Sequence, residues 1–135
     1  MRTTTAGAVI AAALVLTGCS TDQPTAAELA RKACGTIGTT GHTTSVPTGT
    51  GISPSDAGPF ADSINQSADL AAKAAVQDAR WNDLADAYSA MASQAAQIKA
   101  ITAQTGQPAL APDQTAWGVA TDTIYSECRK ANVAN

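Results

Sequence analysis

The fold is constrained most by residues 61–105, which contain no Gly or Pro across 45 positions. Most of these residues are strong helix formers. As one straight helix the segment would be about 68 Å long, whereas a globular domain of this size has a radius of gyration of about 13 Å. A single rod would leave most of its surface unpacked. We therefore expect the segment to fold back on itself, and the alternative is one bent helix.

The expected reversal lies at residues 78–83 (DARWND), where polar side chains crowd together and Asn82 or Asp83 can cap a new helix. The apolar face before it consists of Phe60, Ile64, Ala68, Ala71 and Ala75. After it, apolar residues alternate three and four apart, as in the seam of a helical bundle. They are Trp81, Leu84, Tyr88, Met91, Ala95, Ile98 and Thr102.

Two further helices flank this segment. Thr25 and Glu28 have the spacing of a capping box and predict a first helix, whose length Gly35 and Gly38 limit. Residues 35–58 follow, with 18 of 24 positions Gly, Thr, Ser or Pro, and predict a surface loop. Its threonines are candidate glycan acceptors, although a plain loop is the simpler interpretation.

The last helix is expected over residues 113–131, after a turn that contains Pro108 and Pro112. Its inner face consists of Trp117, Ala120, Ile124 and Cys128. The sequence therefore predicts an all-α fold, a small and mainly antiparallel bundle of four helices, or three if the middle helix is continuous.

The N-terminus has the layout of a secretory signal peptide, with Arg2 before an unbroken apolar run of eleven residues, Ala6–Leu16. The run is shorter than the roughly 20 apolar residues that span a bilayer. It ends in Leu16-Thr17-Gly18-Cys19. This sequence resembles the lipobox of bacterial lipoproteins at every position, and the alanine-rich composition is typical of actinobacterial proteins.

The resemblance implies cleavage before Cys19 and a diacylglyceryl group on its sulfur. Residues 1–18 would then be the signal peptide, 19–24 a tether, and 25–135 a helical domain on the outer face of the cytoplasmic membrane. The alternative is an ordinary signal peptide cut near Gly18, which would leave Cys19 as a free thiol.

Beyond Cys19 the chain has two cysteines, Cys34 and Cys128. In an exported protein an even pair predicts a disulfide first, and both residues fall on or beside the apolar stripes of their helices. The alternatives are a metal site or a reactive thiol. A metal site lacks ligands in the sequence, since the chain has one histidine, His42, in the Gly/Thr-rich loop.

Charge and motifs favour a binding role over catalysis. Without residues 1–18 the chain has seven Lys and Arg against eleven Asp and Glu, a net charge of −4. No basic run for nucleic acid or for a membrane surface appears, and no catalytic, phosphate-binding or metal-binding motif is present. We expect no enzyme activity and no cofactor. Arg80 and Trp81 form a candidate interaction surface, although burial of Trp81 under the turn is favoured.

The resulting hypothesis is a lipid-anchored, non-enzymatic interaction module that contacts another envelope protein or a wall component. A carrier or sensor of a small apolar ligand inside the bundle is the alternative from a different class. A third hypothesis, a prophage-type lipoprotein that excludes superinfecting phages, depends on analogy of size and anchor alone.

Overall fold

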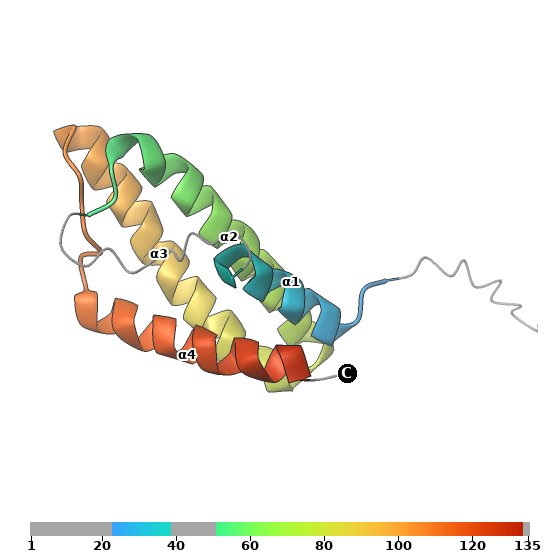
Figure 1. The fold of residues 1–135 in the computed structure, drawn as a ribbon. Coiled ribbons are helices and arrows are strands. Elements are labelled where there is room, and N and C mark those ends of the chain that lie inside the picture. Colours follow the sequence, from blue (N-terminus) through green and yellow to red (C-terminus); the bar gives the residue numbers. More distant parts are fainter. Residues whose placement is uncertain (1–22, 39–50, 134–135) are drawn as a thin grey trace, which may run out of the picture.

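The computed structural model describes residues 23–38 and 51–133, and this part of the chain is all-α. Its α-helices are α1 (Ala26–Gly38), α2 (Pro54–Gln77), α3 (Asn82–Thr105) and α4 (Gln114–Val133), with a short 3-10 helix, η1 (Ala79–Trp81). In Figure 1, α2 and α3 form a long antiparallel pair, and α4 crosses α3 and ends near the start of α1. Contacts join α1 to α2, α2 to α3, α3 to α4 and α4 to α1, so the four helices form a ring, as expected.

The expected capping box begins α1. The backbone N–H of Thr25 donates to Glu28 Oε2 at 2.7 Å, and the N–H of Glu28 donates to Thr25 Oγ1 at 3.3 Å. The first of these bonds stabilises the carboxylate and holds the pKa of Glu28 below its ordinary value. The helix continues through Gly35 to Gly38.

The reversal between α2 and α3 confirms that the 61–105 segment forms two helices. Asp78 caps the 3-10 helix η1, because its Oδ1 accepts from the N–H of Arg80 at 3.0 Å. The N-cap position of α3 is Trp81, so neither Asn82 nor Asp83 caps that helix as expected. Asn82 is instead the first residue of α3, which has no side-chain cap.

The segment between α1 and α2 is shorter than the expected 35–58 loop. Helix α2 begins at Pro54, where Ser53 accepts from the N–H of Asp56 at 3.3 Å and proline occupies the first helical turn. Pro59 lies within the helix. Residues 39–50, which include His42 and most of the candidate glycan acceptors, lie outside the described residues.

An unexpected contact joins the two long connections. Ile52 and Ala109 form an isolated antiparallel bridge, in which each backbone N–H donates to the other residue's carbonyl, with nitrogen-to-oxygen distances of 2.8 and 3.0 Å. Ala109 and Ala111 are buried, and the side-chain oxygen of Gln94 accepts from the N–H of Asp113 at 3.1 Å. These bonds hold the 106–113 connection against α3 at Gln94 and against the residues just before α2 at Ile52.

The core follows the expected stripes of α3 and α4, but the stripe of α2 differs. All seven residues of the stripe expected after the reversal are buried, including Trp81 of η1. On α4, Trp117, Ala120 and Ile124 are buried as expected, whereas Cys128 is half-buried. On α2, Phe60, Ala68 and Ala75 are only half-buried. Because α2 packs between α1 and α3, the centre of its buried face is rotated. The buried residues are Ala57, Ala61, Ile64, Ser67, Ala71 and Ala74.

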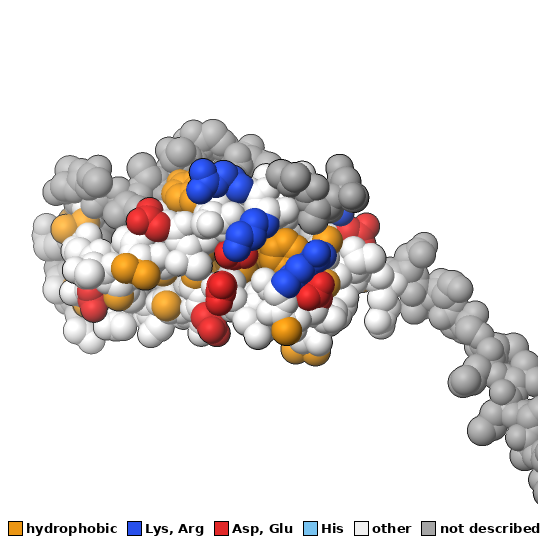
Figure 2. Space-filling model, turned by 90° about the horizontal axis from the view of Figure 1, so that it is seen from below, with side chains coloured by type: hydrophobic (Ala, Val, Ile, Leu, Met, Phe, Trp, Pro, Cys, Tyr) orange, Lys and Arg blue, Asp and Glu red, His pale blue; other side chains and the backbone are white. Residues whose placement is uncertain are grey.

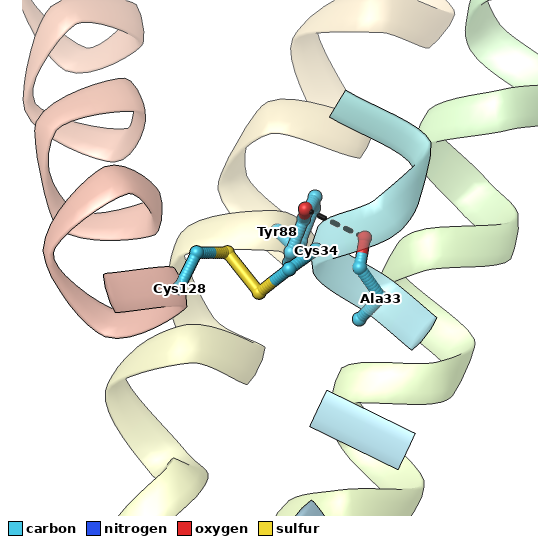
Figure 3. Close-up of a disulfide and its surroundings, with 4 residues drawn as sticks. All are labelled: Ala33, Cys34, Tyr88 and Cys128. Carbon is cyan, nitrogen blue, oxygen red and sulfur yellow. Dashed lines mark hydrogen bonds between the residues drawn. A yellow bond between two sulfur atoms is a disulfide. The ribbon is translucent and has the colours of Figure 1, made fainter. Parts of the chain in front are cut away.

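The expected disulfide between Cys34 and Cys128 is present and joins α1 to α4 (Figure 3). The S–S distance is 2.02 Å and the two Cα atoms are 5.6 Å apart. Beside it, the hydroxyl of Tyr88 donates to the carbonyl of Ala33 at 2.9 Å (Figure 3). The bond and the disulfide together fix α1 to α3 and α4.

Candidate functional site

The residues that the sequence singles out fall into two groups. Leu16, Thr17, Gly18 and Cys19 lie outside the described residues. Arg80 and Trp81 lie among the described residues, and they do not form one exposed surface. Trp81 is 2% exposed and packs under the turn. Arg80 lies over its ring, 5.0 Å from the centroid, and pairs with Asp78 at 2.9 Å.

The structure shows a groove between α3 and α4 that the sequence did not single out. It has a volume of about 520 Å³ and opens widely to solvent. The α3 side is lined by Asp83, Asp86, Ala87 and Ala90, and the α4 side by Ala116, Val119, Ala120 and Thr123. We call this surface the α3/α4 groove.

The α3/α4 groove combines an apolar floor with an acidic edge. Ala87 and Ala120 are buried at the floor of the groove, whereas Val119 is 62% exposed. Asp83 and Asp86 are three residues apart, so they lie on one side of α3. Neither forms an ion pair with another described residue. An apolar floor beside unpaired carboxylates suits a segment that carries both an apolar and a cationic side chain.

A second hollow lies between α1 and α2, beside the start of the described chain. Its lining residues are Gln23, Pro24, Leu29, Ala72, Lys73, Val76 and Gln77, and its volume is about 440 Å³. The side-chain amide of Gln77 donates to the carbonyl of Pro24 at 3.3 Å and so fixes the chain there. We call this surface the tether cleft.

The interior itself is closely packed. A hollow in the core, lined by Phe60, Ile64, Met91, Trp117, Thr121, Ile124 and Tyr125, has about 10 Å³, room for roughly one water molecule. The rings of Phe60 and Trp117 are 5.9 Å apart across it. A small apolar ligand is much larger than this hollow.

Within the described ranges, no three His, Cys, Asp or Glu side chains come together as ligands for a metal ion. Over the same residues, none of the helices has both the length and the hydropathy to cross a bilayer. One buried carboxylate, Glu127, was missed by the sequence reasoning; it is 4% exposed and pairs with Lys130. The only indication of this pair in the sequence is the three-residue spacing of Glu127 and Lys130, which places both side chains on one side of a helix.

Comparison with known proteins adds no relative. No family model matches the chain, and neither a curated protein nor a solved structure matches it.

Proposed function

We propose that this protein is a lipid-anchored, extracytoplasmic interaction module whose α3/α4 groove binds a segment of another envelope protein. The lipobox at Leu16-Thr17-Gly18-Cys19 supports the anchor. The observation that carries the binding role is the groove itself. It is open to solvent, has a volume of about 520 Å³, and combines an apolar floor with two carboxylates on one edge that pair with no described residue.

The chemistry of the groove favours recognition over bond making. Its side chains are methyl, isopropyl, hydroxyl and carboxylate groups. Alanine floors let a partner backbone or a medium-sized apolar side chain approach closely, and the carboxylates of Asp83 and Asp86 favour a lysine or arginine beside it. The partner we propose is therefore a protein segment with adjacent apolar and basic residues.

The carrier hypothesis gains less support. A ligand carried inside the bundle needs an internal cavity of several hundred Å³, whereas the core hollow between α2, α3 and α4 holds about 10 Å³. The groove and the tether cleft are surface features and suit macromolecular contacts better.

The anchor is tested with the residue that would bear the lipid. In the native host, the Cys19→Ser variant should lose the mass of the lipid, move from the detergent phase to the aqueous phase, and change its electrophoretic mobility. Unaltered partitioning and mobility would rule out the lipid anchor.

The binding role is tested in intact membranes with a photoreactive residue at Ala90 in the groove and, as the matched control, at Ala100 on the exposed face of α3. We expect one protein to crosslink from Ala90 and not from Ala100. The double change Asp83→Lys and Asp86→Lys should abolish that crosslink. Equal crosslinking from both positions, or insensitivity to the charge reversal, would contradict the proposal.

A further inference from the structure

The tether cleft carries an exposed apolar residue next to an unpaired cation. Val76 is 89% exposed, the most exposed large apolar side chain among the described residues. Lys73 lies one helical turn before it on α2 and makes no ion pair with a described residue. A single exposed apolar residue is ordinary on a protein surface. Here, however, Val76 continues a cleft that Pro24, Leu29 and Ala72 also line.

The cleft lies beside the point where the lipid would be attached. Gln23 lines it, and the four residue steps from Cys19 to Gln23 span at most about 14 Å. A bundle held on so short a connection must keep some surface near its attachment point against the headgroups. Gln23 and Pro24 also line a second hollow, and the tether cleft is the more apolar of the two, with Leu29, Ala72 and Val76 in its wall.

The cations of the bundle are distributed toward the same end. Seven lysines and arginines occur in the described residues. Of these, only Lys99 lies at the end of the bundle away from the tether, in the second half of α3, and it pairs with Asp62.

Carboxylates also lie at the tether end: Asp78 and Glu127 pair with Arg80 and Lys130, whereas Asp83 and Asp86 at the start of α3 pair with no described cation. Glu28, at the start of α1, accepts from the N–H of Thr25. Figure 2 shows this distribution on one face, where Lys and Arg lie in the middle and toward the tether, among Asp and Glu, and none at the opposite end.

We propose that the tether cleft docks on the anionic surface of the bilayer, with Val76 inserted among the headgroups and Lys73 against lipid phosphates. The proposal depends on the lipid anchor proposed above. Lys32, one turn after Leu29 on α1, adds a second exposed cation beside the cleft. Asp69 lies one turn before Lys73 on α2, farther from the tether, so it sets the limit of the docked surface.

Docking in this way orients the binding surface. The α1–α2 pair and the α3–α4 pair lie on opposite sides of the ring of helices. When the tether cleft faces the bilayer, the α3/α4 groove therefore faces away from it, toward the cell wall. The carboxylates of Asp83 and Asp86 are then removed from the negative surface potential that would repel them.

The test uses lipidated protein from its host, reconstituted into vesicles of phosphatidylcholine alone or of equal parts phosphatidylcholine and phosphatidylglycerol. A membrane-impermeant amine reagent is applied, and labelling of each lysine is measured by mass spectrometry. In anionic vesicles the labelling rate of Lys73 should fall about fivefold, which is the change that corresponds to about 1 kcal/mol of attraction for one lysine near an anionic surface. Lys99 should label equally in both kinds of vesicle.

Val76→Ser should restore the labelling of Lys73, and Val119→Ser, an exposed valine on α4, serves as the matched control that should not. Both side chains lie outside the core, so circular dichroism should show unchanged folding. Equal labelling of Lys73 in both kinds of vesicle, or an equal loss at Lys73 and Lys99, would overturn the docking proposal. Absence of the lipid mass on Cys19 would remove the anchor as well, whereas a normal lipid mass with unprotected Lys73 would remove the docking alone.

Discussion

Gly51 is held in a conformation that other residues rarely adopt. Its φ is +73°, and a Cβ added there would lie 2.8 Å from the carbonyl carbon of Ala109. Gly51→Ala should therefore lower the free energy of unfolding by about 1–3 kcal/mol, through backbone strain and disruption of the Ile52–Ala109 bridge. Denaturant unfolding measures this change.

Gly118 provides the matched control for Gly51. It lies within α4, and a Cβ there would meet nothing within 4 Å. Gly118→Ala should raise the free energy of unfolding by up to about 1 kcal/mol, because alanine is the better helix former. If the two substitutions had equal effects, the bridge at Ala109 would have no special role in stability.

Tyr88 is buried and its hydroxyl is hydrogen-bonded to the backbone of α1. Its hydroxyl donates to the carbonyl of Ala33, and removing that hydroxyl in Tyr88→Phe should cost about 1–2 kcal/mol near neutral pH. Burial raises the pKa of Tyr88 above the value of about 10 for an unfolded tyrosine. The folded chain therefore keeps this proton at a pH where the unfolded chain has lost it.

The sign of this effect is fixed by linkage. The contribution of the Tyr88 proton is complete below about pH 10 and is lost as pH rises further, toward the raised pKa of the folded state. Stability measured from pH 8 to pH 11 should fall less steeply in Tyr88→Phe than in the parent protein. Parallel slopes for Tyr88→Phe and the parent protein would contradict the assignment.

At the scale of the helices, α1 depends on its attachments. An isolated helix of 13 residues is marginal in water, and α1 is held by its packing, the Tyr88 bond and the disulfide. Cys34 and Cys128 are 94 residues apart, and closing a loop of that length stabilises the folded state by about 4–5 kcal/mol in the entropic model.

Replacing both cysteines with alanine should therefore lower the melting temperature strongly, and hydrogen exchange should increase first in α1. The effect should match that of reducing the parent protein. If reduction left exchange in α1 as slow as in α3, the packing of α1 alone would be sufficient to hold it.

The helices show how far sequence periodicity reaches. The α3 stripe was predictable because one helix face meets the core at regular three- and four-residue intervals. The predicted stripe of α2 differs from the buried one by one residue in places. Phe60 and Ala75 have several alanines as neighbours in the sequence, and the local pattern does not show which of these apolar residues face the core. The bridge at Ile52 and Ala109 and the α3/α4 groove depend on contacts between distant segments, which local pattern does not encode.

At the scale of the whole molecule, small side chains determine how closely the helices approach. Ala71 and Ala95 are fully buried, as are Ala30 and Ala33 of α1. Close-packed interiors resist added volume. Ala71→Leu should therefore force α2 away from its neighbours and cost about 1–3 kcal/mol, which denaturant unfolding would detect.

Ala72 is the matched position, because it adjoins Ala71 on α2 but is exposed. Ala72→Leu adds the same volume with the same helix propensity, so it should change stability by less than about 0.5 kcal/mol in solution. If Ala71→Leu were equally harmless, the helices would have to separate without loss. In that case the interior would have room to open around a small apolar molecule, and the carrier hypothesis would regain the cavity that it needs.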